Sequence, residues 1–401
     1  MATLCKNCGA PVIFDPKTQK VVCTVCGGSW EAEEIEATDK GFEEKNRAVS
    51  MNDVYGNTAK EFMDCYIYTC GSCGGEIVIN GSEVSTKCIY CGSTSVVFNR
   101  ISKEKAPEFI LPFSISKEEA LEQINKTFSK RLFVPKEIKN LNPTAVRGIY
   151  VPYWIVNGLH SEADLISGRR GNGKSSHSVY CGRAGMMGIT NLPVDASLML
   201  SDESSQRLEP YDLSKLKYFD EDYLLGFYSN VSDVTNADLY EAVNKRASES
   251  FQNKAMESFT GATGKKVHFS RTATLINRDV FYAMLPVWFV TFDYQGKHNT
   301  IMVNGQTGKV VGGVPWSKKV YGIYFAILAT LLSVLFSAGF YAATAHAEVK
   351  EAGSLPTLLF VIAMFTLVPV LIGAATMKKL KTQLGRSQSE SIFNFAKKRQ
   401  E

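Results

Sequence analysis

The sequence predicts a multidomain protein that combines two small β-structured ribbons, an α+β domain with an antiparallel sheet, and a C-terminal transmembrane helical hairpin. Three observations support this fold class. Eight of the ten cysteines fall in C-x-x-C pairs, the centre of the chain mixes helical and strand patterns, and two long apolar segments lie near the C-terminus. A length of 401 residues leaves room for several compact units.

The predicted units follow one another in a simple order. They are a first ribbon (1–32), an acidic and partly helical linker (33–64), a second ribbon (65–100), the α+β domain (101–316), the two-helix hairpin (317–377) and a basic tail (378–401). The tail has a formal charge of +5, so the rest of the chain sums to −1 and is nearly neutral. No apolar stretch precedes Cys5, so we expect no secretory signal.

Eight cysteines form two matched sets of four, which are Cys5, Cys8, Cys23 and Cys26, and then Cys70, Cys73, Cys88 and Cys91. In both sets fourteen residues separate the pairs, and the second set begins 65 residues after the first, so one unit is repeated. Two C-x-x-C turns that face each other across a hairpin supply the four thiolates of a tetrahedral zinc site. A redox dithiol is the alternative, but such motifs occur singly at the start of a helix. We therefore predict two structural Zn²⁺ ions with no open position for catalysis.

The residues around the cysteines agree with a ribbon. A glycine follows the second cysteine of each pair, where we expect the positive φ that a tight turn requires; these are Gly9, Gly27, Gly74 and Gly92. Short apolar segments at 12–14 and 20–22 flank a turn at Asp15-Pro16. Residues 77–79 lead into Asn80-Gly81, a strong hairpin signal.

Zinc ribbons often bind nucleic acid, which is the main alternative to protein binding. The first hundred residues have a formal charge of −4, and each zinc with four thiolates adds −2. Phosphate contact and counterion release require clustered lysine and arginine, which this segment lacks. The charge therefore favours a protein-binding or purely structural role for the ribbons.

Two segments, 320–345 and 355–377, contain no Asp, Glu, Lys or Arg, and each exceeds the roughly 20 residues that span a bilayer core. Buried core helices are the alternative. Lysines precede the first segment and follow the second, which predicts a multi-pass cell-membrane protein with both termini cytoplasmic. Reduced thiols for zinc agree with that location. The basic tail either lies on an anionic leaflet or is a solvated flank.

The α+β domain contains recognisable local patterns. Ser116-x-x-Glu119 is a capping box that starts a helix, and residues 237–259 predict a second amphipathic helix. Segments 148–156 and 283–290 share a P-x-W core, which we interpret as equivalent strands of two related halves. The sequence from 287 to 314 predicts a three-stranded meander.

Residues 168–175 match the phosphate-loop pattern G-x-x-x-x-G-K-S. That chemistry requires a helix that starts at Lys174, but the residues that follow are β-like, so we interpret the match as a glycine-rich hairpin tip. Cys181 and His177 project to the same face of this strand, but nothing supplies an oxyanion site. We therefore predict no enzymatic activity.

The ribbons combine with five further motifs, which are Leu111-Pro112-Phe113, Tyr150–Trp154, Leu208–Asp212, Leu285–Trp288 and Asn304–Lys309. This combination resembles the bacterial TFIIB-type zinc-ribbon membrane proteins over essentially the whole chain. That family is often labelled replication-helicase-like, although no helicase motif is present here. Its members are similar to accessory proteins encoded beside SPFH-like and phage-shock-type membrane proteins.

The resemblance implies a non-enzymatic, membrane-anchored adaptor or scaffold that recruits cytoplasmic or peripheral membrane proteins. The alternative function is a membrane-tethered ribbon protein that binds nucleic acid in replication or transcription. The acidic charge of the ribbons makes nucleic acid the less favoured partner.

Overall fold

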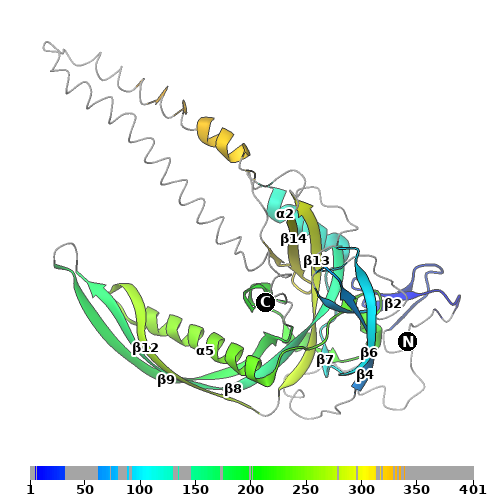
Figure 1. The fold of residues 1–401 in the computed structure, drawn as a ribbon, viewed down its shortest axis with the longest axis horizontal. Helices are drawn as coiled ribbons and strands as arrows, with labels where there is room; N and C mark the ends of the chain where they lie inside the picture. Colours follow the sequence, from blue (N-terminus) through cyan, green and yellow to red (C-terminus); the bar gives the residue numbers. More distant parts are fainter. Residues whose placement is uncertain are drawn as a thin grey trace.

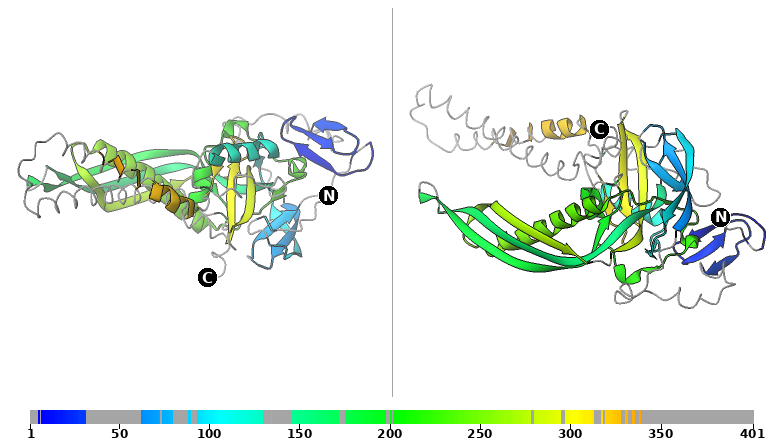
Figure 2. Two further views of the ribbon diagram at one scale, coloured as in Figure 1. Left: turned by 90° about the horizontal axis from the view of Figure 1, so that it is seen from above. Right: turned by 60° about the horizontal axis from the view of Figure 1, so that its bottom comes forward.

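The computed structural model describes residues 5–31, 62–129, 134, 146–197, 200–277, 280–312 and parts of 317–338, apart from 6, 73, 80–87, 90–92, 172–174, 201 and 295–296. These residues form one three-stranded sheet and one twelve-stranded sheet. Figure 1 shows a compact body from which a long curved arm extends. In Figure 2 the first ribbon and strands β4 to β6 lie at the end of the molecule opposite the tip of that arm.

The small sheet is the first ribbon, with β1 (Val12–Asp15), β2 (Lys20–Cys23) and β3 (Ser29–Glu31) in the order β1-β2-β3. β1 and β2 pair antiparallel, with Val12 opposite Cys23 and Asp15 opposite Lys20. The predicted hairpin around Asp15-Pro16 is therefore confirmed.

The large sheet follows the order β10-β7-β13-β8-β11-β5-β4-β6, with β9 and β12 pairing β8, and with β14 pairing β13 and β15. Its first six strands are β4 (Phe62–Cys70), β5 (Glu76–Ile79), β6 (Val96–Lys105), β7 (Phe109–Ile110), β8 (Val146–Arg170) and β9 (His177–Asp195). The other six are β10 (Lys217–Tyr218), β11 (Tyr228–Ser229), β12 (Thr263–Ile276), β13 (Phe281–Tyr294), β14 (Lys297–Asn304) and β15 (Val310–Val311).

Among the described residues the helices include α2 (Lys117–Ser129), α4 (Asp202–Leu208) and α5 (Asn236–Ser258), with short 3-10 turns η5 (Leu213–Lys215) and η6 (Glu221–Leu224). Residues 319–327 are also helical. The capping box of α2 is confirmed. The Glu119 N–H donates to Ser116 Oγ at 3.3 Å, and the Ser116 N–H donates to Glu119 Oε2 at 2.8 Å. α5 agrees with the predicted second helix and begins with a further capping box at Thr235 and Asp238.

The two P-x-W segments pair with each other at the centre of the large sheet. β8 and β13 run antiparallel, with Pro152 opposite Met284 and Pro286 opposite Tyr150. Both faces of these strands are buried, since Tyr150, Tyr153, Phe281 and Phe289 are almost fully inaccessible. The meander predicted from 287 to 314 is confirmed by the pairing of β13 with β14 and of β14 with β15.

The arm consists of β8, β9 and β12, with α5 lying along its concave side (Figure 1). The phosphate-loop pattern, residues 168–175, lies at the far end of the arm. It covers the last residues of β8, which ends at Arg170, and the connection to β9, which starts at His177. A strand follows where a phosphate loop requires a helix, and Gly171 has a φ of 98°, as a turn residue. The interpretation of this segment as a hairpin tip is confirmed.

The predicted transmembrane hairpin is wrong. No helix in the part of the chain that the structure describes is long and apolar enough to cross a membrane. The segment 355–377 and the basic tail lie outside the described residues, as does most of the linker. In the described residues the fold class is corrected to a three-stranded sheet and a twelve-stranded sheet with a few helices. The large sheet is mixed and not antiparallel as predicted, because β8 pairs β11 and β7 pairs β13 in parallel. The multi-pass cell-membrane location with both termini cytoplasmic loses its support.

Candidate metal centre and adjoining cleft

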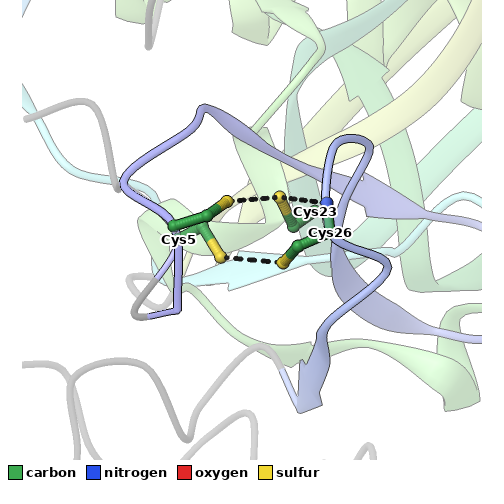
Figure 3. Close-up of side chains that lie close together, drawn as sticks. Cys5, Cys23 and Cys26 are labelled. Carbon is green, nitrogen blue, oxygen red and sulfur yellow. Dashed lines mark hydrogen bonds between the residues drawn. The ribbon is translucent and has the colours of Figure 1, made fainter.

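The structure brings together the first set of predicted ligands. Cys5, Cys8, Cys23 and Cys26 hold their sulfur atoms within 4.8 Å of one another, and Figure 3 shows three of them turned toward a common centre. Cys5 Sγ lies 3.4 Å from Cys26 Sγ, and Cys8 Sγ lies 3.6 Å from Cys23 Sγ. A tetrahedron with metal–sulfur bonds of about 2.3 Å has edges of about 3.8 Å. The four cysteines can therefore hold a metal ion.

The backbone builds both halves of this centre in the same way. The Cys5 N–H donates to Ala10 O at 2.8 Å, and the Gly9 N–H donates to Cys5 O at 2.8 Å. The second half repeats these bonds from Cys23 to Gly28 O at 2.8 Å and from Gly27 to Cys23 O at 3.0 Å. Gly9 and Gly27 have φ values of 70° and 72°, which confirms the expected positive φ.

Backbone N–H groups also favour the charged form of these thiols. The Asn7 N–H lies 3.4 Å from Cys5 Sγ, and the Cys26 N–H lies 3.5 Å from Cys23 Sγ. The Cys26 N–H is the main cause that lowers the pKa of the Cys23 thiol to about 6, whereas burial and the neighbouring thiols raise the pKa of Cys8 and of Cys26. Since the thiolate is the form that binds metal, this backbone prepares the site for a cation.

Two ligands of the second predicted set are described, and two, Cys73 and Cys91, lie outside the described residues. The Cys70 N–H donates to Gly75 O at 2.9 Å, and the Gly74 N–H donates to Cys70 O at 2.8 Å. The Cys88 N–H donates to Ser93 O at 2.6 Å. These bonds join residues four and five apart, as in the first set. Cys70 and Cys88 are both buried in one apolar cluster.

The first ribbon packs directly against the body. The Phe14 ring lies 5.2 Å from the Tyr223 ring, and the Phe14 N–H donates to Leu225 O at 3.0 Å. Gln19 Nε2 donates to Phe113 O at 2.6 Å. Apolar ribbon residues and two of the metal ligands belong to the same buried cluster as Phe113, Tyr150 and Tyr223; they are Cys5, Val12, Phe14, Val21 and Cys23. The metal centre therefore closes the ribbon at the margin of a shared core.

A cleft of about 530 Å³ lies where the ribbon meets the body. The ribbon supplies residues 13–16, 22 and 24, the start of α2 supplies 116–118, and Arg147, Tyr228 and Trp288 lie on the opposite wall. Arg147 Nη1 donates to the Tyr228 hydroxyl at 3.3 Å, and Trp288 Nε1 donates to Ile115 O at 2.8 Å. This volume is within the range of ligand-binding clefts. Sequence patterns could not reveal the cleft, because its walls come from separate segments.

Sequence reasoning also missed a buried polar cluster in the arm. His160, Glu162 and Asp164 alternate along β8 and face α5, and all three are less than 5% exposed. Glu162 Oε1 accepts hydrogen bonds of 2.9 Å from three side chains, those of Ser248, Gln252 and Ser270. The signal that could have revealed it is the spacing of two residues, which assigns the three side chains to one face of a strand.

Comparison with known proteins adds one relative. No family model matches the sequence, and no solved structure matches it. The uncharacterized protein YdjG of Bacillus subtilis (strain 168) is 30% identical over 357 residues, which cover 84% of this chain and 98% of YdjG. The similarity extends over nearly the full length of YdjG and is not confined to the ribbons. The chain therefore belongs to the same family as YdjG.

Proposed function

We propose that this protein is a non-enzymatic docking scaffold in which a structural zinc ion holds the first ribbon against the body. The observation that carries the proposal is the convergence of four sulfur atoms at the margin of the shared core. Four thiolates complete the coordination of zinc and leave no position for a substrate, so the metal acts on structure.

The proposal includes a second zinc ion at Cys70, Cys73, Cys88 and Cys91. Its support is the backbone pattern at Cys70 and Cys88, which matches that of the first set. Elemental analysis of the reduced protein should give two zinc ions per chain. A tetrahedral sulfur site also suits iron, which would colour the protein, whereas zinc would not. A content of one metal ion or none, or iron in place of zinc, would contradict this assignment.

The cleft beside the first ribbon is the proposed docking position. It has an apolar floor, with Phe14, Phe227 and Trp288, and charged groups at its margin, with Lys117 and Arg147 against Asp15 and Glu118. A concave site that combines apolar and charged side chains suits a side chain or short segment of a partner protein. The partners that the family resemblance implies are cytoplasmic or peripheral membrane proteins, including SPFH-like or phage-shock-type proteins.

Two adjacent ribbon residues allow a matched test. Thr24 lines the cleft, whereas Val25 is 72% exposed and does not. Thr24→Arg should place a long cation in the cleft and abolish co-purification of proteins that the wild type and Val25→Arg retain. Cys5→Ser should lose the same proteins, because it removes the ribbon wall. If Thr24→Arg retains every partner identified by mass spectrometry, docking in this cleft is excluded.

A further inference from the structure

The strands of the arm carry an unusual charge. No acidic residue occurs from 165 to 194 or from 258 to 278. Each of these two segments contains four cations, so together they have a formal charge of +8. Within the described residues, β8, β9 and β12 bring the two segments side by side. The strands in the outer half of the arm are therefore basic.

The cations on the concave face of the arm form hydrogen bonds with residues at the C-terminal end of α5. Arg170 donates to Gly261 O and Thr260 O, Arg183 donates to Ser258, and Lys265 donates to Met256 O. These acceptors lie at or just beyond the end of α5, where positive charge complements the helix dipole. The concave cations therefore fix the helix in its place.

The convex face has a different arrangement. Tyr180 and Lys266 flank Ser167 of the middle strand, and Phe269 lies opposite Leu165. Tyr180 is 60% exposed and Phe269 is 58% exposed. The Tyr180 ring lies 6.0 Å from the His268 ring in an edge-on arrangement. Together Tyr180, His268 and Phe269 form an exposed ring platform near the tip of the arm.

Three cations accompany the ring platform. Arg169, Lys266 and Arg271 are exposed, and they alternate with the ring positions on the same face of β8 and β12. The nearest acidic side chain along β8 is Asp164, which is buried on the other face. An anionic ligand with flat rings would therefore meet complementary charge and stacking surfaces together.

We propose that this convex face binds single-stranded nucleic acid. The bases would stack on the ring platform, and the phosphates would contact Arg169, Lys266 and Arg271. A duplex hides the faces of its bases, so exposed rings favour a single strand. A lipid surface would favour strongly exposed aliphatic side chains at the tip, whereas Leu275 and Met186, at 70% and 73% exposed, lie nearer the body, and Leu165 beside the platform is 37% exposed. This activity lies outside the ribbons and goes beyond the docking function.

The ring contribution can be tested by fluorescence anisotropy with a labelled single-stranded oligothymidylate and the full-length, zinc-containing protein. Removal of one stacking ring weakens binding by about 5- to 150-fold. Tyr180→Ala with Phe269→Ala should therefore weaken binding strongly, while Tyr180→Phe with Phe269→Tyr should retain it. Tyr66→Ala with Phe98→Ala is a matched control, because these rings are 48% and 52% exposed on β4 and β6.

The cations can be tested through the dependence of binding on salt. Each phosphate contact to a single strand contributes about 0.7 to the slope of log K against log salt concentration. Lys266→Gln with Arg271→Gln should lower that slope by about 1.4. Lys245→Gln with Lys254→Gln, which removes two exposed cations from α5, should leave it unchanged.

Four outcomes would overturn the proposal. The wild type could fail to bind the oligonucleotide at low salt, or the alanine pair could bind as well as the wild type. A duplex of the same length could bind more tightly than the single strand. Finally, vesicles containing phosphatidylglycerol could bind the arm and lose that binding in the alanine pair while the oligonucleotide does not bind, which would identify a lipid surface.

Discussion

His160 and Glu162 are hydrogen-bonded, with Nε2 at 2.7 Å from Oε2, and neither side chain is accessible to solvent. The Thr274 hydroxyl donates to Asn244 Oδ1 at 2.7 Å and lies 2.8 Å from His160 Nδ1. Both imidazole nitrogens therefore have polar partners inside the arm. This pair lies in the middle of the contact between β8 and α5, between the apolar clusters at its two ends.

Asp164 is the member of this cluster whose carboxylate lacks hydrogen bonds. Neither of its carboxylate oxygens has a hydrogen-bond partner, although the residue is only 4% exposed. Burial, together with the nearby Glu162, raises its pKa. On β9 the residue opposite is Arg183, but its guanidinium bonds Ser258. The other polar side chains around this cluster are neutral and add no charge that could stabilise the Asp164 carboxylate. They are Asn244, Ser248, Gln252, Ser270 and Thr274.

Asp164→Asn should therefore stabilise the protein near neutral pH. A carboxyl whose pKa is raised by folding binds more protons in the native state, so its favourable contribution is complete below about pH 3.9 and is lost as pH rises through the folded pKa. Asparagine mimics the protonated form at every pH. Urea unfolding should show a higher free energy of unfolding at pH 7 to 8 and no gain below about pH 4. The exposed Glu249→Gln on α5 is the control and should give no such profile. An equal or lower stability of Asp164→Asn at pH 8 would refute the prediction.

Glu162→Gln should have the opposite effect. Burial opposes ionisation of Glu162, but hydrogen bonds from His160, Gln252, Ser270 and Ser248 outweigh it and lower its pKa. The substitution removes the carboxylate that accepts these hydrogen bonds and leaves buried donors without a charged acceptor, which costs about 1 to 3 kcal/mol. Because a lowered carboxyl pKa contributes stability above about pH 4.3 and loses it as pH falls through the folded value, the difference from the wild type should shrink in acid. The same urea series measures the difference, and a loss under 1 kcal/mol at pH 7 would contradict the stabilising role of the Glu162 carboxylate.

Cys5→Ser should reduce the zinc content by one ion and unfold only the first ribbon, since each set of cysteines closes its own hairpin. Hydrogen exchange should increase at β1 and β2 and stay unchanged at β4 and β5. Tyr223 should become more exposed, because its contact with Phe14 is lost. Complete loss of zinc, or unchanged exchange in β1, would show that the two ribbons are coupled or that Cys5 is not a ligand.

Phe14→Ala separates packing from metal binding. The Phe14 side chain is 2% exposed and contacts Tyr223, so its removal should destabilise the protein by about 3 to 5 kcal/mol while the zinc content stays the same. Ile13→Ala is the matched control, since Ile13 is 37% exposed on the other face of β1. If both variants lose the same stability, the ribbon does not depend on the shared core.

Several features follow from the sequence because the contacts that define them are local. The bonds from Cys5 to Ala10 and from Ser116 to Glu119 join residues three to five apart, so short patterns are enough to predict them. The same holds for the first ribbon hairpin and for α5, whose buried residues recur with the period of a helix. The membrane hairpin was predicted from apolar length and flanking lysines, and it is wrong, because no helix among the described residues is long and apolar enough to cross a membrane.

The tertiary structure alone decided which surfaces meet. Alternation along β8 assigns His160, Glu162 and Asp164 to one face, but not the element that covers it, and Thr274 lies 114 residues along the chain from His160. The cleft and the ring platform likewise combine segments that are distant in sequence. The repeat of apolar residues, every two residues in a strand or every 3.6 in a helix, shows which side chains share a face. Which other strand or helix covers that face depends on the packing and solvation of the whole chain.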